Sequence, residues 1–180
     1  DCFFSACVSH SPVTVKAAPR IMGVDVARFG EDRSAIVERR GAEMRVLKVR
    51  RGQDTMATTG DVQSLLRGAD EAGDPYRFVV VDSIGIGAGV ADRLKEQGVA
   101  VIPVNVGQSS RMPEKYKNLR AELWNAYREW LGSGSVPHEL MTDSCSIQYG
   151  YDSSGKLQME RKEDMKKRGI NSPDLADAAC

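Results

Sequence analysis

The sequence predicts an α/β domain in which a mixed central β-sheet is flanked by helices and accompanied by an extra β-hairpin. Three short strand-like segments come first, at Ile21–Val26, Ser34–Arg39 and Met44–Arg50. Strands and helices then alternate along the chain, which is the pattern of a sheet with helices on its faces. Near the end, two further strand-like segments bracket a turn at residues 152–155, and this predicts the hairpin.

The clearest strand is expected at Tyr76–Val81, because Phe78–Val81 is a continuous apolar run rich in β-branched residues. The last helix is expected to begin near Pro173, with Ser172 as its N-cap. The other expected elements are a strand at Val99–Val104, helices at Asp54–Ala72, Gly87–Gln97 and Leu119–Leu131, and hairpin strands at Ser146–Tyr151 and Lys156–Glu160.

Composition sets the class of protein but not its function. Hydrophobic residues make up 41% and charged residues 28% of 180 residues, which is typical of one globular domain with tails. Lys+Arg and Asp+Glu are balanced at 25 each, so no overall basic field indicates a nucleic-acid partner. No apolar run is long enough to cross a bilayer, and none of the four cysteines forms the CxxC pair of a zinc site.

The first twenty residues lack a periodic pattern. Residues 1–20 contain Pro12 and Pro19, and we expect them to form a linker or irregular arm. The ordered domain is expected to span residues 21–180. Because the chain begins with Asp1 rather than Met, we expect it to be a piece of a longer protein.

Acidic residues stand at the points where chemistry is expected. Asp25 closes the first apolar strand and Asp82 closes the clearest one, while Asp174 and Asp177 lie three residues apart on the last helix and share a face. Carboxylates at the ends of buried strands are destabilising unless they are paired or bind a cation. Oxygen ligands favour Mg²⁺ or Mn²⁺, and two such ions roughly 3.5–4 Å apart can hydrolyse a phosphodiester.

Each of these acids also has an ordinary explanation. A single aspartate at a strand end is commonly a turn or cap residue, and Asp174 alone could be a first-turn acid favoured by the helix dipole. The metal-site hypothesis therefore depends on the acids occurring together in three separate segments.

Four segments resemble, in order, the nuclease motifs of the large terminase subunits of tailed phages. They are GVDVARFGEDRS at residues 23–34, VVVDSIGIG at 79–87, RAELW at 120–124, and KEDMKKRG at 162–169 followed by SPDLADA at 172–178. The resemblance runs from about Ile21 to the end. It implies an RNase H-like fold and a metal-dependent DNA endonuclease that cuts concatemeric viral DNA during genome packaging.

The resemblance also implies roles for individual acids. Asp25, Asp82 and one of Asp174 or Asp177 would bind two Mg²⁺ or Mn²⁺ ions. Many members of the family carry two adjacent acids where this chain has Pro173–Asp174, so the third ligand stays open between the two. We favour Asp174 as the metal ligand, with Asp177 as a close second or auxiliary catalytic residue.

Partners follow from the same resemblance. The substrate would be double-stranded DNA in the cytoplasm of a bacterial host, with no membrane involved. Residues 1–20 would be the linker from a missing N-terminal ATPase domain, and the small terminase subunit and the portal would be further partners.

Basic residues near the acids are candidates for DNA contacts. Arg28 and Arg33 flank the first acid, and a second group precedes the third acid: Lys162, Lys166, Lys167 and Arg168. Cations in these places could hold backbone phosphates near the metals. Alternatively, the arginines pair with Glu31 and Asp32, and the second group is the solvated face of a helix.

Two glycine patterns are set aside, and three other functions remain open. Gly150–Lys156 has the spacing of a phosphate-binding loop but is followed by Leu157 and a strand, and the glycines at 85, 87 and 89 lack the GxGxxG spacing of a dinucleotide site. The alternatives are an RNase H-like Holliday-junction resolvase, a non-catalytic docking module of the packaging motor, and half of an actin-like or sugar-kinase ATPase, which would need a second lobe.

Overall fold

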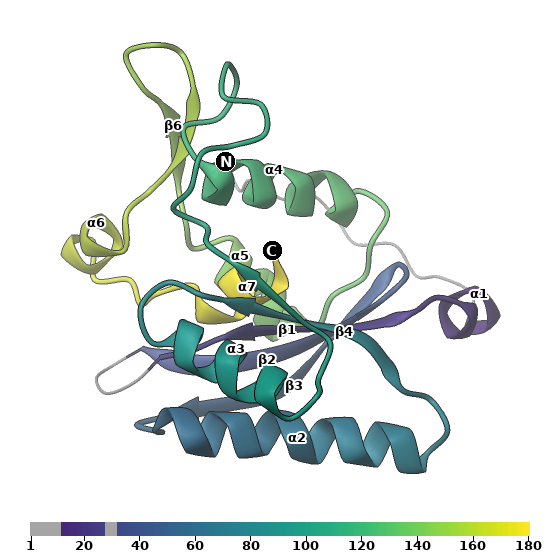
Figure 1. The fold of residues 1–180 in the computed structure, drawn as a ribbon. Coiled ribbons are helices and arrows are strands. Elements are labelled where there is room, and N and C mark those ends of the chain that lie inside the picture. The colour runs from purple at the N-terminus through teal and green to yellow at the C-terminus, as the bar shows by residue number, and fades with distance from the viewer. Residues whose placement is uncertain (1–11, 28–31) are drawn as a thin grey trace.

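The computed structural model describes residues 12–27 and 32–180 (Figure 1). Their strands are β1 (Arg20–Asp25), β2 (Arg33–Arg40), β3 (Glu43–Arg51), β4 (Tyr76–Asp82), β5 (Val101–Val104), β6 (Tyr149–Tyr151) and β7 (Leu157–Met159). Their helices are α1 (Pro12–Ala17), α2 (Thr55–Glu71), α3 (Gly87–Glu96), α4 (Leu119–Leu131), α5 (His138–Ser144), α6 (Lys162–Lys167) and α7 (Asp174–Ala179).

The central sheet is mixed, as the sequence predicted. Its five strands lie in the order β3-β2-β1-β4-β5. β2 is antiparallel to both of its neighbours, whereas β1, β4 and β5 run parallel. This arrangement confirms the RNase H-like fold class. It also brings the carboxyl ends of β1 and β4 to the same edge of the sheet.

Helices cover both faces of the sheet (Figure 1). On one face, α2 and α3 pack over a cluster that includes Met22 and Val24 of β1 with Val79 and Val81 of β4. On the other face, α4, α5 and α7 surround Trp124 and a second apolar cluster. Side chains alternate between the faces of a strand. The alternation therefore turns the remaining β1 residues, including the terminal acid, toward α7.

Three short helices were not anticipated. α1 lies within the segment expected to be an irregular arm, and that expectation is wrong for Pro12–Ala17. The Arg40 guanidinium donates hydrogen bonds to the carbonyls of Val15 and Lys16 at the end of this helix, so a residue distant in sequence stabilises it. α5 begins at His138, and α6 carries most of the basic group that precedes the last acid.

The final helix begins differently from the prediction. α7 starts at Asp174, and Pro173 occupies the N-cap position without a side-chain cap. The Ser172 hydroxyl is buried and has no hydrogen-bond partner within the described residues. The prediction that Ser172 caps this helix is therefore wrong. The Asp143 side chain accepts hydrogen bonds from the first amides of the helix instead.

The hairpin is confirmed, although its strands are shorter than expected. β6 and β7 pair antiparallel from Tyr149–Met159 to Tyr151–Leu157. The Asp152 carboxylate accepts hydrogen bonds from the amides of Ser154 and Lys156, and Gly155 has a φ of 76°. A strand follows this glycine, so the segment lacks the helix that a phosphate-binding loop requires. No helix in the described ranges is long and apolar enough to cross a membrane.

α7 packs directly on β1 because Gly23 has no side chain. A Cβ placed on Gly23 would lie 2.0 Å from the carbonyl oxygen of Ala178 and 3.2 Å from the Val37 side chain. Backbone atoms cannot yield as a flexible side chain can. The glycine therefore sets how closely the last helix, with its two acids, approaches the end of the sheet.

We expect Gly23→Ala to lower the free energy of unfolding by about 3 kcal/mol, the upper end of what overpacking causes. Gly89→Ala is the matched control, because a Cβ there meets no atom within 4 Å. That change should stabilise α3 by about 0.5–1 kcal/mol. Urea unfolding followed by circular dichroism measures both. Equal stability of the two variants would contradict the close approach of α7.

Candidate active site

Two acids lie side by side at the carboxyl ends of parallel strands. Val24 of β1 pairs with Val81 of β4, so Asp25 and Asp82 follow at neighbouring positions. Asp25 is 7% exposed, and the Asp82 Oδ1 atom accepts a hydrogen bond of 3.0 Å from the Ile84 amide. The sequence placed both acids correctly, because each one directly ends an apolar run.

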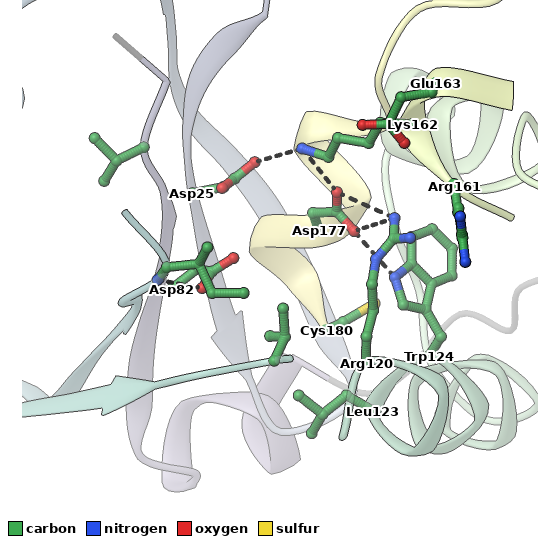
Figure 2. A pocket seen from close by; sticks show the side chains of 13 residues that line it. Asp25, Asp82, Arg120, Leu123, Trp124, Arg161, Lys162, Glu163, Asp177 and Cys180 are labelled. Atoms are coloured by element: carbon green, nitrogen blue, oxygen red, sulfur yellow. Dashed lines mark hydrogen bonds and ion pairs between the residues drawn. The ribbon is translucent and has the colours of Figure 1, made fainter. Parts of the chain in front are cut away.

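α7 brings two further acids to this edge, and a lysine ammonium lies among them. The Lys162 Nζ atom is 3.3 Å from Asp177 Oδ2, 3.8 Å from Asp174 Oδ1 and 4.0 Å from Asp25 Oδ2. Figure 2 shows this ammonium between Asp25 and Asp177, which approach from opposite sides. Three carboxylates from β1 and α7 therefore share one cation from α6.

Asp177 is held from the side of α4. Its Oδ1 atom accepts hydrogen bonds from the Trp124 indole nitrogen at 3.0 Å and from Arg120 Nη2 at 3.1 Å (Figure 2). Trp124 is almost fully buried in the core. Its one polar atom nevertheless orients an acid of the site.

Asp174 is held from the side of β2. Its Oδ2 atom accepts hydrogen bonds from the Arg33 amide at 2.8 Å and from Arg33 Nε at 3.3 Å. Its Oδ1 atom is buried and has no hydrogen-bond partner within the described residues. A buried carboxylate oxygen without a donor is destabilising. This atom is therefore available to a cation.

Burial and like charge raise the pKa values of the two strand-end acids. The pKa of Asp25 is raised to about 8, first by burial and second by the nearby Asp177 carboxylate, while Lys162 lowers it. Burial also raises the pKa of Asp82, although the Ile84 amide opposes this. Burial lowers the pKa of Lys162, but the surrounding carboxylates together raise it above its ordinary value. The pocket therefore favours more positive charge than one ammonium provides.

The acids border a pocket of about 400 Å³. Its charged lining residues are Asp25, Asp82, Asp177, Glu163, Arg120, Arg161 and Lys162. Asp174 is not among the lining residues. Within residues 12–27 and 32–180, no group of three or more acidic, histidine or cysteine side chains is arranged to hold a metal ion. The carboxylates are grouped around a lysine rather than drawn together around a single point.

The residues expected to contact DNA lie in different surroundings. Arg28 falls outside the described residues. Arg33 and Lys162 are engaged with the acids, as given above. The remaining candidates pair with other acids: Lys166 with Asp32 at 3.7 Å, Lys167 with Asp164 at 2.6 Å, and Arg168 with Glu160 at 2.5 Å.

Solved structures with the same fold are nuclease domains of phage large terminases. The nuclease domain of the large terminase subunit gp2 of bacterial virus Sf6, in a structure with manganese and β-thujaplicinol, superposes with a TM-score of 0.72 at 19% identity, covering 89% of this chain and 86% of that one. The large terminase nuclease from thermophilic phage G20c with bound magnesium gives 0.60 at 20% identity, covering 89% and 78%.

A third relative in structure is the large terminase nuclease domain of Thermus phage P74-26, with a TM-score of 0.62 at 16% identity, covering 90% of this chain and 76% of that one. The chain has the fold of a phage large-terminase nuclease domain. No protein-family model matches the sequence, and no curated protein matches it either.

In this terminase-nuclease fold, sequence reasoning missed Asp143 altogether. The Asp143 carboxylate accepts hydrogen bonds from the Leu175 and Ala176 amides, and it pairs with Arg33. Nothing in its local sequence predicts this role, because its partners lie more than thirty residues away. Glu122, in the segment that resembles the family's helix motif, has a structural role, since it accepts hydrogen bonds from the Ser110 hydroxyl and the Arg111 amide.

The raised pKa of Asp25 predicts that the metal-free protein loses stability as pH rises. Between the ordinary value of 3.8 and about 8, the folded chain keeps a proton that the unfolded chain has released. The folded state thus binds more protons in this window, and the free energy of unfolding falls from about pH 4 to about pH 8.

Asp25→Asn should flatten this dependence and stabilise the metal-free protein at pH 8 by at least about 1 kcal/mol, or roughly 2–4 °C in melting temperature for a chain of this size. Thermal unfolding at several pH values, with chelator present, measures the effect. Superimposable pH profiles for the variant and the original protein would mean that Asp25 is ionised throughout.

Proposed function

We propose that this domain is a metal-dependent DNA endonuclease that cleaves concatemeric viral DNA during genome packaging. One observation carries the proposal: carboxylates from β1 and α7 converge on a single ammonium within 4.0 Å. Such crowding of like charges is destabilising unless a bound cation neutralises them. It is expected where divalent cations bind, and nuclease domains with this fold have been solved with manganese and with magnesium.

The donor chemistry of the pocket fits Mg²⁺ or Mn²⁺. All candidate ligands are carboxylate oxygens, the pKa of Asp25 is raised, and the buried Asp174 Oδ1 atom lacks a donor. We propose Asp25, Asp82 and Asp174 as ligands of two ions. When bound, such ions activate water and stabilise the leaving oxygen of a phosphodiester.

Asp177 has a different part in the proposal. Trp124 and Arg120 already occupy its Oδ1 atom, and its Oδ2 atom faces Lys162. Asp177 therefore adds negative charge to the pocket while α4 keeps its carboxylate in place. This supports Asp174 as the third ligand and Asp177 as an auxiliary catalytic residue.

The residues around the pocket are suited to bind and orient the DNA backbone. Arg120 and Arg161 line the cavity with Lys162, and guanidinium groups bind phosphate oxygens through two donors at once. Lys166 and Lys167 are 53% and 76% exposed. Their surface ion pairs are weak, so phosphates can replace them. Double-stranded DNA is the proposed substrate.

The likeness to large-terminase nucleases also supports a cellular setting. We propose that the domain acts in the cytoplasm of a bacterial host, in one chain with an N-terminal packaging ATPase domain. The small terminase subunit and the portal are the further proposed partners.

We expect this protein to nick and linearise a supercoiled plasmid with Mn²⁺ or Mg²⁺, and to lose activity when chelator is added. Asp25→Asn and Asp82→Asn should each lower the rate by more than the roughly 100-fold that loss of an outer-shell partner causes, with folding intact. Gel electrophoresis of timed samples measures the rate.

Asp70→Asn, on the exposed surface of α2, is the matched control and should cleave at the original rate. Full cleavage by Asp25→Asn would refute the proposed site. A protein that binds portal or motor components yet cuts neither linear duplex nor a four-way junction would be a docking module instead. A strong preference for the junction would identify a resolvase.

A second prediction concerns DNA affinity. Replacing both Lys166 and Lys167 by alanine should weaken duplex binding and reduce the slope of log K against log salt by about 2, because two phosphate contacts are lost. Arg67→Ala with Lys95→Ala removes two exposed cations from α2 and α3 and should leave the slope unchanged. Fluorescence anisotropy in chelator, at several salt concentrations, provides the slopes. Identical slopes for both double variants would exclude α6 from the DNA interface.

A further inference from the structure

The helix that carries two of the site's acids has no local N-terminal cap. Pro173 cannot cap α7 with its side chain, and the Ser172 hydroxyl is unpaired within the described residues. The first amides of a helix need acceptors when they are buried. α7 is short, from Asp174 to Ala179, so it depends on neighbouring elements for its position.

Asp143 provides the missing acceptor from α5. Its Oδ2 atom accepts hydrogen bonds from the Leu175 amide at 2.8 Å and the Ala176 amide at 3.2 Å. The Asp143 side chain is only 14% exposed, so water can replace little of this hydrogen bonding. A carboxylate at this end of a helix is also stabilised by the helix dipole.

Arg33 joins the same carboxylate to the third acid. Its Nη2 atom donates to Asp143 Oδ1 at 3.0 Å, and its Nε atom donates to Asp174 Oδ2 at 3.3 Å. The Arg33 amide also donates to Asp174 Oδ2, at 2.8 Å. With Oδ2 fixed by two donors, the other oxygen of Asp174 faces the Lys162 ammonium at 3.8 Å.

We propose that Asp143 and Arg33 are positioning residues that hold α7 against β2 and aim the Asp174 Oδ1 atom toward the Lys162 ammonium, where the proposed metal would bind. The inference rests on the proposed function, because it concerns the ligand set of that site. It assigns Asp143 a role that its sequence context does not indicate. It also gives Arg33 an internal role in place of a contact with DNA, since both of its carboxylate partners lie inside the domain.

The test is the affinity for Mn²⁺ alone, measured by calorimetry without DNA. Asp143→Ala and Arg33→Ala should each weaken Mn²⁺ binding by about 10–100-fold, as loss of a ligand's supporting partner does. The effects should not add in the double variant, because Asp143 and Arg33 are hydrogen-bonded to each other in one network. Unchanged Mn²⁺ affinity in Asp143→Ala would overturn the proposal.

Asp54→Ala separates positioning from simple loss of a helix cap. The Asp54 carboxylate caps α2 by accepting from the Ala57 amide at 2.7 Å, and α2 carries none of the site's acids. This control should lower stability but leave Mn²⁺ affinity intact. An equal loss of affinity in Asp54→Ala would overturn the proposal. So would an Arg33→Ala variant that binds DNA more weakly in chelator and Mn²⁺ as before.

A metal-free measurement distinguishes this inference from the proposed function. The Trp124 indole N–H donates to Asp177 on α7, so its indole N–H NMR signal reports the position of that helix. Loss of the other indole signal in Trp130→Phe assigns it. Asp143→Ala should shift the signal and Asp54→Ala should not. If the original protein binds no Mn²⁺, the proposed function fails, and the indole signal still decides: a shift supports positioning by Asp143, and an unchanged signal overturns it.

Discussion

Repulsion among buried carboxylates is the constraint on which the arrangement of this domain depends. Asp25 is almost fully buried at the end of β1, with its pKa raised to about 8. α7 then adds Asp174 and Asp177 to the same edge. A fold selected only for stability would place apolar or neutral groups here. The site is instead kept folded by cations from three other elements, at β2, α4 and α6.

Close backbone packing at two points brings the acids within reach of those cations. Gly23 lets α7 lie directly over β1, and a Cβ on Gly87 would lie 1.8 Å from the Asp82 carbonyl oxygen, so α3 starts immediately behind that acid. The carboxylates are thus brought together by helix–strand packing before any charge is balanced. Gly23 and Gly87 thus allow the close approach of secondary structure.

The sequence predicted most of the fold and the strand-end acids, because both are local signals. Asp25 and Asp82 each end an apolar run, so their positions follow from strand periodicity. Ser172 also had a favourable local pattern, but tertiary structure overrode it, and Asp143 from α5 became the acceptor. Spacing could not decide between Asp174 and Asp177 as the proposed third metal ligand, since both share a face. The two acids differ in their hydrogen-bond partners: Asp174 is bound by Arg33, and Asp177 is bound by Trp124.

The balanced composition is explained by where the basic residues are used. Arg33, Arg120 and Lys162 neutralise the acids of the site from within. Lys166 and Lys167 of α6 remain more than half exposed beside it. The basic residues therefore form two groups that the total charge of the chain does not distinguish. One group stabilises the pocket, and the other faces solvent. The proposed DNA-cleaving site needs both sets, because its acids repel the phosphates of the proposed substrate. Net charge alone is thus no guide to whether such a domain binds nucleic acid.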